Sequence, residues 1–268
     1  LCEPDNQMKT IAIANQKGGT GKTTTAYNLG IALTQQGYRV LMVDFDPQGN
    51  LSCYCGIPPE QDLEQTITEL LMKVAYEKPL SHRECVYQSR RTDDSAPQVD
   101  FIPSNLRLAS FELAMGTMMC REVLLKTCLE QYSSQYDYCI IDNPPDIGLN
   151  VVNALAITDE VIVPVKVDED ALEGLDIVTE QIEDAKAFNP ALKLAGVLIT
   201  SYQNTDGEAA GVEWLEQKTD FNILGIIRYS KKVAENTFMR KPIYEYSPCC
   251  GAAQGYKKFV TAYTGKAR

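Results

Sequence analysis

The sequence predicts a single α/β domain with a mostly parallel β-sheet covered by helices on both faces. Short apolar strands alternate with helical segments along the chain, as expected for βα units that build a parallel sheet. The first of these strands leads directly into a turn rich in glycine and lysine and then into a helix, an arrangement typical of phosphate binding. We therefore expect one P-loop domain over residues 8–268, preceded by a loose or added extension at residues 1–7.

The composition is that of an ordinary globular protein, with 44% hydrophobic and 23% charged residues in a chain of 268. No apolar run approaches the roughly 18 residues of a membrane-spanning helix. The first residues lack the basic and apolar regions of a signal peptide. Nine cysteines, without a CxxC pair, favour reduced thiols over disulfides. These features predict a cytoplasmic protein without a membrane partner.

The expected elements follow from periodicity and from turn residues. Strands are expected at 9–15, 39–44, 99–103, 136–142, 160–165, 193–200 and 222–227. Helices are expected at 23–36, 63–76, 106–132 with a break near Gly116, 150–157, 171–188, 207–218, 231–240 and 252–263. The stretch 51–98 is the least regular, and we expect it to form helices and loops over the site rather than a separate domain.

The glycine-rich turn consists of Lys17, Gly18, Gly19, Thr20, Gly21, Lys22 and Thr23, followed by Thr24. Its glycines permit a tight turn whose backbone N–H groups face a ligand, and the helix N-terminus adds positive charge. Lys22 is expected to reach the β- and γ-phosphates of a nucleotide, and the Thr23 hydroxyl to bind Mg²⁺. A tight turn without a ligand is the alternative, but it explains neither the second lysine, Lys17, nor the adjacent hydroxyls.

Acidic residues follow two of the apolar strands. Asp44 and Asp46 come at the end of the strand at 39–44, and Asp142 ends the strand at 136–142. Open α/β sheets bind ligands at the carboxyl ends of their strands. One of Asp44 and Asp46 could hold or orient Mg²⁺ or a water, and the other could orient the attacking water. Asp142 fits a water-mediated contact to Mg²⁺. A turn with solvated acids is the alternative for residues 44–50.

Charge is distributed unevenly along the chain. The net charge of −11 argues against a nucleic-acid partner. Residues 223–268, however, contain nine Lys or Arg against two Asp or Glu, a net charge of +7 that leaves −18 on the rest of the chain. A basic end on an acidic body suggests a site for an anionic partner.

Taken together, the lysine-rich loop, Asp44–Asn50 and Asp142–Pro145 resemble the ParA family of DNA-partition ATPases. This family belongs to the deviant-Walker class, which also includes MinD and the nitrogenase iron protein. The resemblance extends over nearly all of the chain from Met8 onward, and Asp46–Asn50 is the ParA-like version of its segment. It implies ATP and Mg²⁺ as cofactors and an ATP-dependent homodimer with nucleotide held between the subunits.

The resemblance also implies roles for individual residues. Lys17 matches the lysine that reaches the partner's ATP, Lys22 the phosphate lysine of the same subunit, and Asp46 the acid needed for hydrolysis. The expected catalytic residues are therefore Lys17, Lys22 and Asp46, and the expected metal-site residues are Thr23, Asp44 and Asp142. Two positions depart from the family pattern. Thr20 replaces a common valine, and Asn143 replaces a threonine whose hydroxyl role cannot be carried over.

Members of the ParA family bind double-stranded DNA without sequence specificity as ATP dimers, and a ParB-like adaptor stimulates hydrolysis and release. The resemblance therefore implies association with the nucleoid in the ATP-bound state. Candidate phosphate contacts are Arg228, Lys231, Lys232, Arg240, Lys241, Lys257 and Lys258. The segment 229–240 departs from the family pattern, so its DNA contacts are not matched one by one. Solvated lysines on terminal helices are the alternative.

Two other functions remain open from the sequence. A MinD-like membrane switch would use the helix at 252–263 as a lipid-inserting helix, although a helix of this length could equally pack on the core. A metal-cluster protein would need paired cysteines, for which Cys139, the pair Cys53 and Cys55, and the pair Cys249 and Cys250 are poor candidates.

Overall fold

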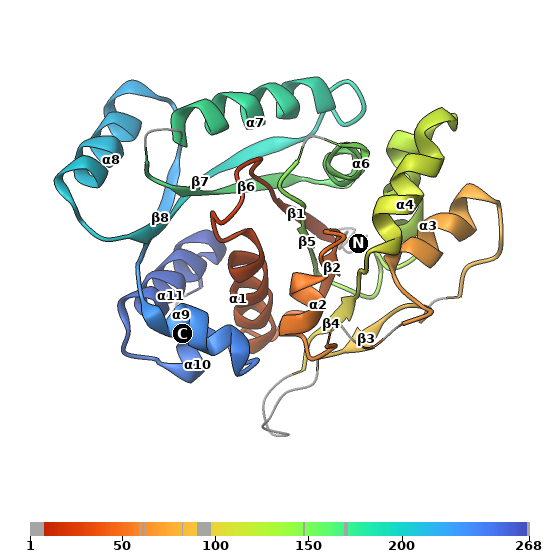
Figure 1. Cartoon of the computed structure of the whole chain (residues 1–268), viewed down its shortest axis with the longest axis horizontal. Helices are drawn as coiled ribbons and strands as arrows, with labels where there is room; N and C mark the ends of the chain where they lie inside the picture. Colours follow the sequence, from red (N-terminus) through yellow and green to blue (C-terminus); the bar gives the residue numbers. More distant parts are fainter. Residues whose placement is uncertain are drawn as a thin grey trace, which may run out of the picture.

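An eight-stranded sheet runs through the centre of the molecule, as Figure 1 shows. The computed structural model describes residues 8–58, 61, 63–81, 83–89, 98–146, 148–168 and 171–266. The strand order is β3-β4-β2-β5-β1-β6-β7-β8, and every neighbouring pair is parallel except β3 and β4. The predicted fold class, with a mostly parallel sheet, is thus confirmed.

The strands are β1 (Lys9–Ile13), β2 (Val40–Asp44), β3 (Tyr87–Gln88), β4 (Asp100–Ile102), β5 (Tyr138–Asp142), β6 (Glu160–Lys166), β7 (Lys193–Tyr202) and β8 (Ile223–Arg228). The helices are α1 (Lys22–Gln35), α2 (Asn50–Tyr54), α3 (Ile67–Ala75), α4 (Arg107–Ala114), α5 (Leu124–Glu130), α6 (Leu149–Ile157), α7 (Ala171–Ala185), α8 (Asp206–Lys218), α9 (Lys231–Phe238), α10 (Ile243–Tyr246) and α11 (Gly251–Thr264).

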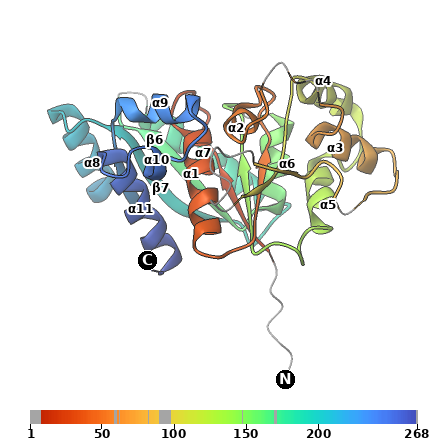
Figure 2. The same ribbon diagram turned by 90° about the horizontal axis from the view of Figure 1, so that it is seen from below.

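Alternation along the strands divides the core between the two faces of the sheet. In β1, Ile11 and Ile13 join a buried cluster with residues of α1, α2, α10 and α11. Ala12, between them, belongs instead to a cluster with residues of α6, α7 and α8. A third cluster, with α3, α4 and α5, covers the same second face over β2 and β5 through residues such as Val43 and Ile141. Figures 1 and 2 accordingly place α3 and α4 at one end of the molecule and α8 at the other.

Two predicted helices differ from the structure. The helix expected at 63–76 begins only at Ile67, because Thr66 caps its N-terminus. The Thr66 hydroxyl accepts a hydrogen bond from the Thr68 N–H at 3.3 Å, and the Glu69 carboxylate accepts one from the Thr66 N–H at 2.8 Å. The helix expected at 106–132 is interrupted near Gly116, as predicted, but the interruption is longer than one residue: α4 ends at Ala114 and α5 begins at Leu124, with two 3-10 turns, 115–117 and 121–123, between them.

Three short elements were not predicted. The strand β3 and the helices α2 and α10 span only two, five and four residues. Segments of this length carry too few residues to show a periodic pattern. The strand β3 is also the one that runs antiparallel, at one edge of the otherwise parallel sheet.

The C-terminal helix is a packing helix. Tyr256, Phe259 and Val260 of α11 are at most 2% exposed, and they join the core cluster that α1 and β1 share. This apolar face is therefore covered within the subunit, which removes the feature that suggested a lipid-inserting helix. Within the described part of the chain, no helix is both long and apolar enough to cross a bilayer. The eight described cysteines are all free thiols.

Candidate nucleotide site

The lysine-rich loop connects the carboxyl end of β1 to the first turn of α1. Gly19 and Gly21 have φ values of 74° and 89°, in the left-handed region that glycine adopts without strain. Gly18 and Gly19 have open space where a Cβ would stand, so ligand atoms can approach the backbone closely. The loop is held from below by the Thr200 hydroxyl, which donates to the Thr20 carbonyl at 2.7 Å.

Lys17 and Lys22 occupy different positions on this loop. The Lys17 ammonium lies 2.6 Å from a carboxylate oxygen of Asp168, just beyond the end of β6. The Lys22 ammonium donates to the Lys17 carbonyl at 3.1 Å and is largely buried. Burial lowers the pKa of Lys22, and the nearby carboxylates of Asp142 and Asp46 oppose this shift. Burial thus disfavours the charged form of Lys22, and an anion that entered the loop would stabilise it.

The predicted acids come together at the carboxyl ends of β2 and β5. These strands are paired in register, so Asp44 and Asp142 lie directly side by side. Both side chains are 0% exposed. Burial raises the pKa of Asp44 to about 7, although hydrogen bonds from Ser52 oppose the rise. The pKa of Asp142 is raised well above its ordinary value by burial and by the charge of Asp44.

Asp44 and Asp46 are held differently. Both the N–H and the hydroxyl of Ser52 donate to one oxygen of Asp44 at 2.7 Å. Asp46, 7% exposed, accepts only the Gln48 N–H, at 2.9 Å, among the described residues. Burial raises the pKa of Asp46, while Lys22 lowers it. Asp44 is thus fixed by helix α2, and Asp46 faces the site.

Three buried oxygen atoms at this edge accept no hydrogen bond from the described residues. They are both carboxylate oxygens of Asp142 and the amide oxygen of Asn143. The Thr23 hydroxyl lies near enough to oppose the rise in the pKa of Asp142, without reaching hydrogen-bond geometry. Unsatisfied buried acceptors are costly, and a hydrated Mg²⁺ would supply the donors that they need. The acids therefore fit a metal ion that keeps its waters.

The described residues contain no cluster of three or more His, Cys, Asp or Glu arranged to bind a metal directly. A magnesium site does not require such a cluster, because Mg²⁺ is usually held by one or two side chains and by water and phosphate oxygens.

A cavity of about 400 Å³ adjoins the loop. Gly19, Gly21 and Thr24 line one side, and residues of the β8–α9 connection and of α9 line the other. This volume lies within the range of small-molecule sites. Arg228 and Lys231, which the sequence suggested as DNA contacts, are among its lining residues. Arg228 and Lys231 therefore lie next to the phosphate-binding loop, although they are also part of the basic C-terminal segment.

The other predicted DNA contacts lie on or next to α9 and α11. Lys257 and Lys258 are exposed on α11, whereas Lys232 forms an ion pair with Glu235 at 2.6 Å. Arg240 and Lys241 are half-buried in the turn between α9 and α10. The structure thus gathers these residues at one end of the molecule, where α9, α10 and α11 meet in Figure 1.

Sequence reasoning missed Asp168, Ser52 and Thr200. Asp168 contacts a residue 151 positions away, and Thr200 one 180 positions away. No local pattern could identify either. Ser52 lies eight residues after Asp44, and only the short helix α2 turns it back onto that carboxylate.

Comparisons with known proteins agree with this geometry. The family model described as "AAA domain" matches residues 8–194. The sporulation initiation inhibitor protein Soj of Bacillus subtilis is 36% identical, over 92% of this chain and 95% of that protein. The chromosome partitioning protein ParA of Caulobacter vibrioides is 35% identical, over 98% of this chain and 96% of that protein.

A solved structure is similar over the same length. Cobyrinic acid a,c-diamide synthase from Mycobacterium smegmatis, crystallised with an ATP analog and magnesium, shares 29% identity. Its TM-score is 0.77, with 97% of each chain covered. The fold and the loop define the class as a P-loop nucleotide-binding α/β protein. Within this class, the chain belongs to the ParA/Soj family of chromosome-partitioning ATPases.

Proposed function

We propose that this protein is an ATP-hydrolysing switch that acts in the partitioning of a chromosome, plasmid or other DNA element. One observation carries the proposal: a phosphate-binding loop with two lysines lies beside buried acids, and one of these acids, Asp142, accepts no hydrogen bond from the described residues on either oxygen. The loop would bind the phosphates of a nucleoside triphosphate, and the acids would bind the metal ion that accompanies them. Similarity to Soj and ParA supports the partitioning role.

ATP with Mg²⁺ supplies the phosphoryl group that is transferred to water. In our proposal, the N–H groups of Gly19–Lys22 and the Lys22 ammonium bind the phosphates. The hydroxyls of Thr23 and Thr24 lie in the first turn of α1, where Thr23 would hold the metal ion. Asp142 and the adjacent Asp44 would accept hydrogen bonds from water molecules bound to that ion.

Asp46 is the residue we assign to the attacking water. Among the described residues its carboxylate accepts one hydrogen bond, from a backbone N–H to Oδ1, so the other oxygen could orient a water. Phosphoryl transfer depends mainly on such positioning and on charge stabilisation. Lys17 supplies a further positive charge to the ATP of the second subunit, which makes full catalytic competence depend on dimerisation.

DNA binding follows from the same dimer. A two-fold pair doubles the basic end, with Lys257 and Lys258 exposed on each subunit. Contacts to phosphates are independent of sequence and sensitive to salt. In this proposal a ParB-like adaptor accelerates hydrolysis, and the loss of ATP releases the dimer from DNA.

Co-sedimentation with double-stranded DNA tests the proposal. The protein is incubated with Mg-ATP, with Mg-ADP or without nucleotide, over a series of salt concentrations. We expect binding with ATP alone, and we expect it to fall steeply as salt rises. Equal binding in all three nucleotide states would contradict the switch, and absence of binding in every state would remove DNA as the partner.

A further inference from the structure

The end of α9 carries two apolar side chains that the rest of the subunit leaves uncovered. Phe238, the last residue of α9, is 92% exposed, and Met239 beside it is 50% exposed. No other large apolar side chain among the described residues is more exposed than Phe238. In Figure 2, α9 lies at the upper surface of the molecule. Single exposed apolar side chains are common, so the surroundings of this apolar tip, Phe238 and Met239, decide whether it serves a partner.

The surroundings of Phe238 are basic. Residues 228–241 contain five cations and one acid, a net charge of +4. The acid, Glu235, is already engaged: Lys232 pairs with it at 2.6 Å, and the Tyr246 hydroxyl donates to it at 2.9 Å. Uncompensated cations favour a polyanionic partner. The cations of this segment that form no ion pair with a described residue are Arg228, Lys231, Arg240 and Lys241.

Helical spacing places Phe238 on one side of α9 together with a cation. Lys231, Ala234 and Phe238 are three and four residues apart, so they follow one another along the same side of the helix. All three are exposed. Lys231 and Ala234 also line the cavity beside the phosphate-binding loop, whereas Phe238 is not among its lining residues. This side of α9 therefore runs from the nucleotide site to the apolar tip.

The turn after Phe238 is fixed to the rest of the protein. The side chain of the buried Asn236 donates to the Lys241 carbonyl at 2.6 Å. The Tyr27 hydroxyl, from α1, donates to the Arg240 carbonyl at 3.2 Å. The backbone that carries Phe238 is therefore ordered before a partner binds, which lowers the entropy that binding costs.

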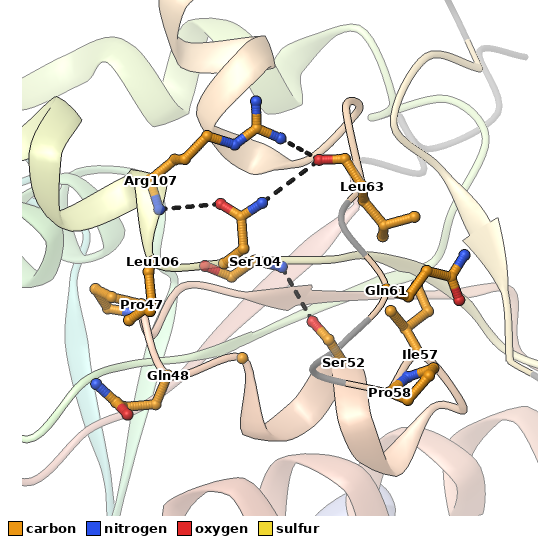
Figure 3. Close-up of a pocket in the computed structure, with 12 residues that line it drawn as sticks. Pro47, Gln48, Ser52, Ile57, Pro58, Gln61, Leu63, Ser104, Leu106 and Arg107 are labelled. Atoms are coloured by element: carbon orange, nitrogen blue, oxygen red, sulfur yellow. Dashed lines mark hydrogen bonds between the residues drawn. The ribbon is translucent and has the colours of Figure 1, made fainter.

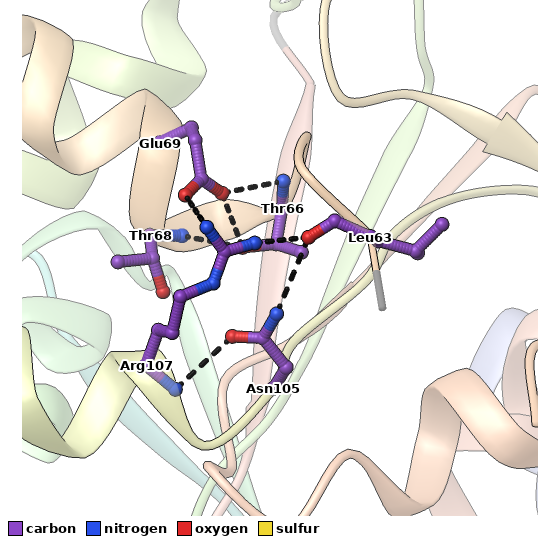
Figure 4. A network of polar contacts seen from close by, with 6 residues as sticks. All are labelled: Leu63, Thr66, Thr68, Glu69, Asn105 and Arg107. Atoms are coloured by element: carbon purple, nitrogen blue, oxygen red, sulfur yellow. Dashed lines mark hydrogen bonds and ion pairs between the residues drawn. The ribbon is translucent and has the colours of Figure 1, made fainter. Parts of the chain in front are cut away.

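A second exposed apolar surface, on α4, differs in its charge. Leu106 and Leu113 are 68% and 84% exposed, and Leu106 lines a cavity beside the loop after β2 (Figure 3). The neighbouring Arg107 is already paired with Glu69 at 2.9 Å and donates to the Leu63 carbonyl (Figure 4). Because this arginine is compensated, the described part of α4 lacks the combination of apolar tip and unpaired cations found on α9.

We propose that Phe238 and Met239 form an apolar wedge that enters the minor groove of double-stranded DNA, while the cations around them contact phosphates. This inference rests on the proposed function and adds to it a contact with the bases. Such wedges partly unstack neighbouring base pairs and bend the duplex. The cost of this distortion is lowest at flexible steps such as TA, so the wedge responds to the deformability of DNA rather than to its sequence directly. Two apolar side chains are too few for stable insertion into lipid.

Phe238→Ala tests the wedge in DNA-binding measurements with Mg-ATP over a series of salt concentrations. Because Phe238 is exposed, its replacement is expected to leave folding unaffected. We expect affinity to fall roughly ten-fold, as for the loss of a contact between an aromatic side chain and a base. The slope of log affinity against log salt should stay unchanged, because an apolar side chain releases no counterions.

The control is Phe188→Ala, which removes another phenylalanine, 52% exposed in the turn after α7. This variant is expected to bind DNA as the wild type does. Wild-type affinity in Phe238→Ala, or an equal loss of affinity in Phe188→Ala, would overturn the proposal.

Duplexes that contain 2-aminopurine report unstacking directly, because this base fluoresces more strongly when it is unstacked. With Mg-ATP, we expect the wild type to raise the fluorescence of a probe in a duplex of repeated TA steps. We also expect it to bind this duplex several-fold more tightly than a stiff A-tract of the same composition. Phe238→Ala should lose both effects. Binding by the wild type without either effect would show contacts to the DNA backbone alone and would overturn the wedge.

Further measurements separate the wedge from other occupants and from the proposed function. Phe238→Ala is expected to form the ATP-dependent dimer as the wild type does, and loss of the dimer would show that a second subunit covers Phe238 instead. Binding of the wild type to phosphatidylglycerol vesicles that Phe238→Ala loses would show a lipid contact and also overturn the wedge. If the wild type binds DNA in no nucleotide state, the proposed function itself fails. If it binds and Phe238→Ala binds equally well, only the wedge fails.

Discussion

Lys17 is held within its own subunit by Asp168, at 2.6 Å, in a partly exposed ion pair. If Lys17 is to reach the partner's nucleotide, this pair must first open. Partly exposed ion pairs contribute only about 0.2–1 kcal/mol, so Asp168 restrains Lys17 weakly and reversibly. Under the proposed function, the ion pair between Lys17 and Asp168 is therefore a contact that would have to open on dimerisation.

We predict that Asp168→Asn favours the ATP-dependent dimer by up to about five-fold, the factor that corresponds to the free energy of the pair. Sedimentation velocity with Mg-ATP at low salt measures this. The control is Asp137→Asn, which opens the pair between Asp137 and Arg39, at 2.7 Å. A dimer weakened by Asp168→Asn, or strengthened equally by the control, would show that the pair does not restrain Lys17.

The acids predict a pH dependence of stability. The pKa of Asp44 is raised to about 7 in the folded protein from 3.8. Between these values the unfolded chain has lost the proton that the folded protein keeps, so stability falls as pH rises and then levels off above pH 7. Asp44→Asn lacks this titration. We expect the stability of the wild type relative to Asp44→Asn to fall by about 3 kcal/mol between pH 5 and 8.

Urea unfolding of both proteins at the two pH values, without nucleotide or metal, provides the measurement. A difference that stays constant with pH would show that Asp44 is ionised in the folded protein throughout. Addition of Mg²⁺ is expected to restore part of the stability at pH 8, because a metal ion favours the ionised acids.

At the residue scale, the sequence indicated the phosphate-binding loop at 17–23 and the acids Asp44, Asp46 and Asp142. The loop follows an apolar strand, and the acids stand at or just after the ends of two others. The sequence could not predict what holds them. Asp168 and Thr200 approach the loop from strands β6 and β7, which only the completed sheet brings beside it. The assignments of the site residues themselves remain predictions.

At the scale of elements, close packing of α11 on β8 depends on a helical glycine. A Cβ at Gly255 would lie 2.8 Å from the Ile226 carbonyl oxygen and 3.1 Å from the Ile227 Cα, both backbone atoms that cannot move aside. A Cβ at Gly207, in α8, would meet nothing within 4 Å. The two glycines therefore serve as a matched pair.

We predict that Gly255→Ala destabilises the protein by about 1–3 kcal/mol, as expected for overpacking. Gly207→Ala is expected to be neutral or to stabilise by up to about 1 kcal/mol, because alanine is the better helix former. Urea unfolding measures both changes. Equal effects of the two substitutions would contradict the packing of α11 against β8.

The sequence predicted most elements, because long helices and buried strands carry clear periodicity. It did not predict how the strands are ordered, since β5 pairs with both β1 and β2 only in the folded sheet. It also missed β3, α2 and α10. Of these, α2 matters most to the site, because its Ser52 fixes Asp44.

At the scale of the whole molecule, the acidic body and the basic C-terminal end form an electrostatic asymmetry. Phosphate contacts release counterions, so each lost contact lowers the slope of log affinity against log salt by about 0.9. We predict that Lys257→Gln combined with Lys258→Gln weakens ATP-dependent DNA binding and reduces this slope by about two per subunit. Lys186→Gln, in the turn just after α7, is the control and should leave the slope unchanged. An unchanged slope in the double variant would exclude both lysines as phosphate contacts.

The central claim is that one subunit holds an incomplete site, which Lys17 of a second subunit completes. Light scattering during gel filtration tests this most directly, in an Asp46→Ala background that is expected to retain unhydrolysed ATP. With Mg-ATP we predict a particle of twice the 29.8 kDa chain mass, and we predict a monomer when Lys17→Ala is added. A dimer that forms equally well without Lys17, or a monomer in both variants, would contradict the account.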